Sequence, residues 1–91
     1  MGKDLILFKN KEHKSRKEVS DFLRQLADKV SDGKVQLRQG QEEVILDLPE
    51  NIIMEVEVKD KEKAKKGIQH QLEIEIKWYD NSDERGPIEL G

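Results

Sequence analysis

The sequence predicts an α+β fold in which one amphipathic helix packs on a mostly antiparallel five-stranded sheet, in the order β-α-β-β-β-β. Two observations support this prediction. Residues 71–78 alternate polar and apolar side chains without a break, as expected of a strand buried on one face. Residues 15–33 instead space their apolar side chains by three and four, as one face of a helix requires. A helix and a sheet with one apolar face each bury those faces against one another, so we expect a two-layer sandwich.

The composition fits one small domain with a highly charged surface. Charged residues make up 41% of the 91 residues and hydrophobic residues 34%. This length supplies one modest core, so we expect a single domain over residues 1–79 and a polar, mobile tail over residues 80–91. The absence of cysteine excludes disulfides and thiolate metal sites. Abundant Lys and Glu, without Cys or Thr, point towards a thermophilic source.

The N-terminal part predicts a strand and then a helix. Residues 5–8 are continuously apolar and are expected to form the first strand. This run is too short for a signal peptide or a membrane span, so we expect a soluble cytoplasmic protein without membrane contact. Ser15 begins the helix, with Glu18 three residues later in the pattern of a capping box. Gly33 supplies the left-handed residue that ends the helix.

The rest of the chain predicts four antiparallel strands. The second strand centres on Val35 and Leu37, and the others on residues 44–48, 52–58 and 68–78. Residues 39–41 are expected to form a turn, and residues 60–67 a charged loop before the last strand. The position of the first strand stays open, because it fits beside the second strand in parallel or beside the fifth in antiparallel orientation.

Three segments resemble a known family. They are Phe-Leu-Arg-Gln-Leu-Ala at residues 22–27, Val-Ile-Leu-Asp-Leu-Pro at residues 44–49, and the amphipathic last strand ending at Trp78. Together they resemble the Amphi-Trp domain family over residues 5–78. That family consists of small bacterial and archaeal proteins, often with one domain per chain, and carries no established activity. The resemblance therefore implies a prokaryotic source and supports the layout, without supplying catalytic residues.

Catalytic chemistry finds little support in the sequence. His13 and His70 lack metal-ligand spacing, no serine lies in a nucleophile elbow, and the six glycines are too scattered for a phosphate-binding loop. We therefore expect no catalytic, cofactor-binding or metal site, and a protein that is not an enzyme. Trp78 is a candidate for stacking on a ligand. The alternation places it with Ile74 and Ile76, however, so we expect it to be a core anchor.

The charge distribution suggests one candidate site. Residues 1–40 carry ten Lys/Arg and six Asp/Glu, a balance of +4, whereas residues 41–91 carry seven and fourteen, a balance of −7. If strand directions alternate, two basic segments lie at the end of the sheet where the helix dipole is positive. Their cations are Lys9, Lys11, Lys14, Arg16, Lys17, Lys61, Lys63, Lys65 and Lys66. This site would bind nucleic acid weakly and without sequence specificity. An ordinary solvated surface is the simpler alternative, because no aromatic residue lies among the cations for base stacking.

The second face of the predicted sheet suggests another site. Its candidate residues are Ile45, Ile53, Glu55, Glu57, Glu73 and Glu75. Exposure to solvent is the default for such a face, and a docking surface for another copy or a basic protein is the alternative. We therefore expect a binding or protein-interaction module that has an unidentified protein partner or associates with itself. Nucleic-acid binding through the basic end is the second hypothesis.

Overall fold

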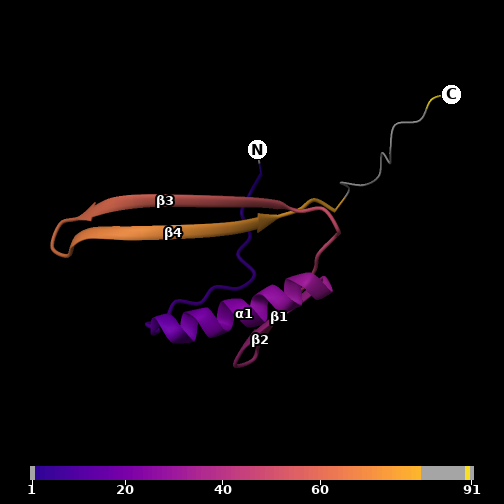
Figure 1. Cartoon of the computed structure of the whole chain (residues 1–91), viewed down its shortest axis with the longest axis horizontal. Coiled ribbons are helices and arrows are strands. Elements are labelled where there is room, and N and C mark those ends of the chain that lie inside the picture. The colour runs from indigo at the N-terminus through magenta and orange to yellow at the C-terminus, as the bar shows by residue number, and fades with distance from the viewer. Residues whose placement is uncertain (1, 81–89, 91) are drawn as a thin grey trace. The chain divides into compact units, whose positions relative to one another are not determined.

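The described part of the chain forms one helix and two β-hairpins, and it divides into two compact units between residues 50 and 51. The computed structural model describes residues 2–80 and 90. The elements are α1 (Arg16–Asp32), β1 (Lys34–Gln39), β2 (Glu42–Asp47), β3 (Ile53–Lys63) and β4 (Gly67–Lys77), labelled in Figure 1. The α+β class predicted from the sequence is confirmed.

Helix α1 begins and ends where the sequence predicts. The Ser15 hydroxyl accepts a hydrogen bond from the backbone N–H of Glu18 at 3.1 Å, and the backbone N–H of Ser15 donates to the Glu18 carboxylate at 3.0 Å. This capping box satisfies two N–H groups at the start of the helix. At the other end Gly33 adopts a φ of 84°, and its N–H donates to the carbonyls of Lys29 and Val30. A residue without a Cβ adopts this left-handed geometry without strain.

The first unit is a small two-layer arrangement in which α1 contacts β1. β1 and β2 form an antiparallel hairpin whose register places Val35 opposite Leu46. Val35 is 5% exposed and is the one buried hydrophobic side chain among the described residues. The backbone N–H of Leu48 donates to the carbonyl of Gly33 at 2.8 Å. This bond ties the chain after the hairpin to the end of the helix.

The second unit contains the long antiparallel hairpin β3–β4, whose two adjacent strands point in opposite directions in Figure 1. Each strand has eleven residues, with Ile53 opposite Lys77 at one end and Lys63 opposite Gly67 at the other. The sequence predicts a loop over residues 60–67, but the ladder continues to Lys63 and leaves only residues 64–66 in the turn. Backbone hydrogen bonds reward continued pairing even where the side chains have low strand propensity.

The predicted five-stranded sheet is not confirmed. β1–β2 and β3–β4 form two separate two-stranded sheets, and residues 5–8 form no strand. Leu5, Ile6 and Leu7 are between 65% and 82% exposed. A short apolar segment becomes a strand only by pairing with a neighbour, and hydrophobic pattern alone does not identify that neighbour. The first predicted strand is therefore wrong in this structure, and the single five-stranded sheet built with it is not confirmed.

Three further expectations concern the tail, the number of domains and the membrane. The predicted tail lies outside the described residues apart from Asp80 and Leu90. The single domain over residues 1–79 stays a prediction. Within the described part of the chain, no helix has the length and apolar composition that a membrane crossing requires.

Candidate interaction surface

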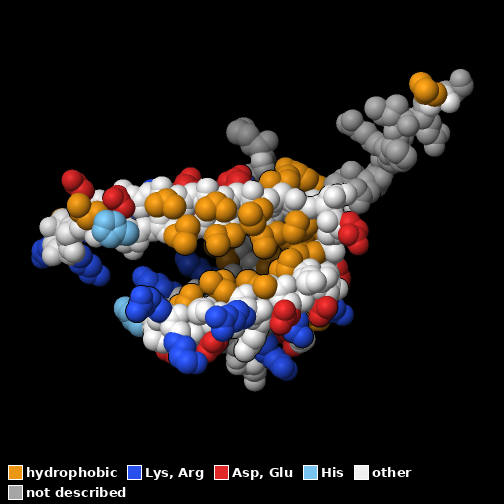
Figure 2. Space-filling model, in the orientation of Figure 1, with side chains coloured by type: hydrophobic (Ala, Val, Ile, Leu, Met, Phe, Trp, Pro, Cys, Tyr) orange, Lys and Arg blue, Asp and Glu red, His pale blue; other side chains and the backbone are white. Residues whose placement is uncertain are grey.

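The clearest candidate surface is an apolar row on one face of the β3–β4 hairpin. Three cross-strand pairs form it: Met54–Ile76, Val56–Ile74 and Val58–Leu72. Directly opposite residues of an antiparallel pair share one face, so these six side chains, the apolar face from here on, form one continuous row. All but Ile76 are 55–73% exposed, and Figure 2 shows apolar side chains in a row along the hairpin. A two-stranded ribbon has no third element of its own to cover such a face.

The apolar face ends at a polar pair, Asp60 and His70. These residues lie opposite one another in the register, and the Nδ1 atom of His70 is 2.7 Å from Oδ1 of Asp60. This pair was not predicted from the sequence, because Asp60 was expected to lie in a loop. The signal was the short turn at residues 64–66, which sets the register and so assigns His70 to Asp60.

The other face of the hairpin brings like charges together. Glu55 lies opposite Glu75, and Glu57 lies opposite Glu73. Like charges in directly opposite positions are destabilising. The Nζ atom of Lys77 lies 2.7 Å from Glu55 and 3.2 Å from Glu75, so its single charge offsets part of the repulsion within this pair.

Lys59 plays the corresponding part for the second pair. Its Nζ atom lies 3.1 Å from Glu57 and 3.9 Å from Glu73. The hydrogen bond that Lys59 donates to Glu57 raises the pKa of Lys59, and the hydrogen bond that Lys77 donates to Glu55 raises the pKa of Lys77. Two lysines thus form ion pairs with four glutamates on this solvent-exposed face. Exposed ion pairs of this kind stabilise a fold only weakly.

The predicted acidic interaction face is brought together in part. Ile53, Glu55, Glu57, Glu73 and Glu75 share this polar face of the β3–β4 hairpin. Ile45 lies on β2 in the first unit, in the other two-stranded sheet. The prediction joined Ile45 to the group because it assumed one continuous sheet.

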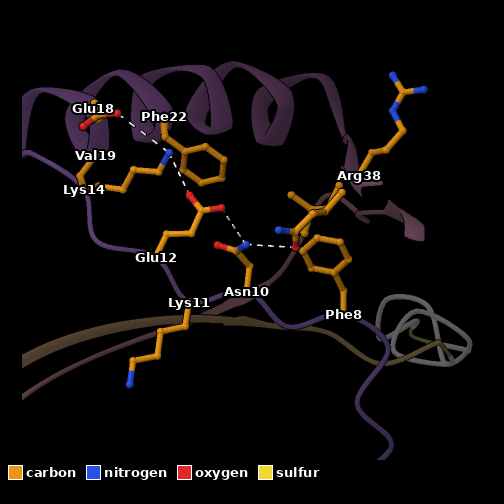
Figure 3. A pocket seen from close by; sticks show the side chains of 11 residues that line it. Phe8, Asn10, Lys11, Glu12, Lys14, Glu18, Val19, Phe22 and Arg38 are labelled. Carbon is orange, nitrogen blue, oxygen red and sulfur yellow. Dashed lines mark hydrogen bonds and ion pairs between the residues drawn. The ribbon is translucent and has the colours of Figure 1, made fainter. Parts of the chain in front are cut away.

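A pocket of about 560 Å³ lies in the first unit, at the start of α1. Phe8, Phe22 and Leu37 supply its apolar wall, and Lys11 and Arg38 supply cations at its rim. Figure 3 shows Phe22 beside Lys14 and Glu12 and Phe8 near the Asn10 end of a polar network. The sequence predicted only strand and helix packing for these aromatic residues, because the pocket depends on the fold of the segment before α1.

The polar side chains in this pocket form hydrogen bonds and ion pairs with one another. Asn10 donates to Glu12 at 3.1 Å, and the Nζ atom of Lys14 lies 2.9 Å from Glu12 and 4.0 Å from Glu18. The hydrogen bond with Lys14 lowers the pKa of Glu12, and the same contact raises the pKa of Lys14. The backbone hydrogen bond from Ser15 lowers the pKa of Glu18. A carboxylate therefore already occupies the positive end of the helix, which weakens the case for an anion site there.

The predicted basic residues fall into two groups in different units. In the first group Lys14 is paired with Glu12, and Lys17 lies 3.2 Å from Asp21. Within the described residues, the following cations have no ion pair: Lys9, Lys11, Arg16, Lys61, Lys63, Lys65 and Lys66. The convergence of the two groups into one basic end stays a prediction.

The family signature extends over nearly the whole chain. The Amphi-Trp domain family matches residues 1–90. The chain belongs to the Amphi-Trp family. No curated protein and no solved structure matches it. The family that three short segments suggested is thus confirmed for this Amphi-Trp domain.

The tryptophan at the end of the last strand is half-buried. In this Amphi-Trp domain Trp78 directly follows β4, which ends at Lys77. Its role as a core anchor stays a prediction. In the described part of the domain, no group of three or more His, Cys, Asp or Glu could hold a metal ion. The expectation that the domain is not an enzyme also stays a prediction.

Proposed function

We propose that this Amphi-Trp domain is a protein-interaction module that binds through the apolar face of its β3–β4 hairpin. One observation carries the proposal: three adjacent apolar cross-strand pairs in which five side chains are 55–73% exposed. Single exposed apolar residues are common on protein surfaces, whereas a contiguous row marks a contact surface. The regular register also presents the row as a pre-formed strip, which lowers the entropic cost of binding.

The energy available from this strip supports the proposal. Burying a large aliphatic side chain completely is worth about 1.5–3 kcal/mol. Because the side chains keep more than half of their surface exposed, a partner that covers them would gain about 1 kcal/mol from each. The hairpin itself gains correspondingly little from them. A partner that presents apolar side chains of its own is therefore the best match.

The proposal is tested by placing charge on the apolar face. The Val56→Lys/Ile74→Lys double variant adds two cations to it, whereas the Gln69→Lys/Gln71→Lys control adds two cations to the polar face of β4. Wild type and both variants are used as bait in native lysate, with mass spectrometry of the captured proteins and circular dichroism as a check of folding. We expect the apolar-face variant to lose specific partners that wild type and the control retain. Identical captured sets for all three folded baits would overturn the proposal.

Nucleic-acid binding is the second candidate function, and the turn of the β3–β4 hairpin favours it. Lys61, Lys63, Lys65 and Lys66 lie within six residues and have no ion pair among the described residues. Binding would be non-specific, with a Kd of roughly 10⁻⁴–10⁻⁶ M at physiological salt, and would weaken steeply as salt rises. Fluorescence anisotropy with labelled single- and double-stranded oligonucleotides tests it, and Lys63→Glu/Lys65→Glu should abolish the signal. Absence of binding at low salt would eliminate this function.

A further inference from the structure

The outer edge of β3 is a second interaction surface on the same hairpin. β3 pairs with β4 along one edge, and none of the described strands pairs with its other edge. The strand is eleven residues long, so this edge presents a row of unpaired N–H and C=O groups about 36 Å in length. Proteins either guard such edges or use them to pair with another chain.

The charges along this edge complement themselves. On the polar face of β3, Glu55 and Glu57 occupy one half of the strand, and Lys59 and Lys61 occupy the other. A second copy running antiparallel, with Val58 opposite Val58, places Glu55 opposite Lys61 and Glu57 opposite Lys59. The two-fold symmetry repeats both pairs, so four opposite-charge pairs form across the new edge.

We propose that two copies of this domain pair edge to edge through β3, antiparallel about a two-fold axis at Val58. The inference rests on the proposed function and deepens it, because it names a second copy of the chain as a partner of the hairpin. The resulting four-stranded sheet would carry Leu72 and Val58 of both copies in one apolar row across its centre. It would thus widen the apolar face while leaving that face free for another protein.

The charge balance of the whole hairpin selects the antiparallel orientation. Residues 53–58 and 72–77 carry four glutamates and one lysine, a balance of −3. Residues 59–71, which contain the turn, carry five lysines and two acidic residues, a balance of +3. Antiparallel pairing places the negative half of one copy beside the positive half of the other. Parallel pairing would place halves of the same charge beside each other.

The second copy also relieves a defect within the hairpin. Glu55 faces Glu75, and Glu57 faces Glu73, with only Lys77 and Lys59 to neutralise four carboxylates. In the paired state Lys61 of the second copy lies beside Glu55. Lysines on an edge strand can also prevent pairing with another chain. Such protection by repulsion requires charges of only one sign along the edge. The segregation of both signs into two halves distinguishes a complementary edge from a guarded one.

Charge reversal at one pair tests the register. Lys61→Glu turns both symmetric copies of the Glu55–Lys61 pair into like-charge pairs, and Glu55→Lys does the same with the opposite sign. We expect wild type to dimerise in sedimentation velocity at micromolar concentration, and each single variant to raise the dimer Kd at least about tenfold. An equimolar mixture of the two variants should restore the dimer, because every pair between them is again opposite in charge. Lys66→Glu makes the same charge change in the turn, outside the paired strand, and should raise the Kd far less than Lys61→Glu does.

Further variants keep the test decisive if one variant folds poorly. The Glu55→Lys/Lys61→Glu double variant restores opposite charges within one chain and should dimerise like wild type. Because the chain has no cysteine, Val58→Cys should form a disulfide-linked dimer faster than Ile53→Cys. Facing Cα atoms lie about 4.5–5.5 Å apart in antiparallel sheets, within disulfide range.

The outcomes separate this inference from the proposed function. A wild type that stays monomeric throughout the micromolar range would overturn the self-pairing, and so would a mixture that fails to restore the dimer. If self-pairing fails while charge on the apolar face still abolishes partner capture, the proposed function survives alone. If the dimer forms as expected while capture is indifferent to that charge, the proposed function fails and the β3 pairing stands.

Discussion

The exposure of the apolar face makes a sharp prediction about stability. Ile74 lies at the centre of the row and is 55% exposed. Complete burial of such a side chain is worth about 1.5–3 kcal/mol, so less than half of this is at stake when Ile74 is truncated. We expect Ile74→Ala to lower the free energy of unfolding by about 1 kcal/mol. Val35→Ala is the matched control, because Val35 is 5% exposed, and it should cost about 2 kcal/mol once the cavity is included.

The assay is urea denaturation followed by circular dichroism, at a protein concentration low enough to keep the chain monomeric. The difference in the free energy of unfolding from wild type gives the cost of each substitution. A buried Ile at position 74 would cost about 2–5 kcal/mol on truncation to Ala. A cost of about 3 kcal/mol or more at low concentration would therefore refute the reasoning, because it would mean that the monomer itself covers the apolar face.

Three further predictions concern α1 and its caps. Ser15→Ala should lower the free energy of unfolding by about 1 kcal/mol in urea denaturation, since it removes the hydrogen bond to the Glu18 N–H; an unchanged midpoint would contradict the cap. The lowered pKa of Glu18 stabilises the fold at pH above about 4.3, the ordinary pKa of Glu, and this contribution is lost as pH falls through the lowered value. Glu18→Gln should therefore flatten the acid side of a Tm-against-pH curve, and a curve parallel to wild type would count against it. Gly33→Ala should destabilise by about 1–2 kcal/mol in the same urea assay because of the φ of 84°, whereas a neutral result would exclude left-handed strain.

The sequence predicted the helix well because its signals are local. Ser15, Glu18 and Gly33 satisfy the backbone groups of the helix ends directly, and these contacts depend only on neighbouring residues. The centres of β1 to β4 were predicted for a similar reason, since alternation of side chains reports on one strand at a time. The apolar row follows from the same alternation once the register is known.

Strand pairing was the part that the sequence could not predict. Which strands share a sheet depends on contacts between distant segments, and residues 5–8 carry an apolar pattern without a defined neighbour. For this reason the sequence placed Ile45 and Ile53 on one sheet, whereas they lie in two different sheets. The extension of β3 to Lys63 was missed because charged residues lower strand propensity, although a ladder already formed continues through them.

The bond between Leu48 and Gly33 has a consequence for the time course of folding. It closes a structure that runs from the Ser15 cap to Leu48, in which the β1–β2 ladder and this bond join residues at most 15 positions apart. In the second unit the most distant paired residues, Ile53 and Lys77, are 24 positions apart. Chains with mostly local contacts fold rapidly, because little loop entropy is lost before contacts form. During synthesis the segment up to Leu48 could thus acquire its structure before the β3–β4 ribbon has left the ribosome.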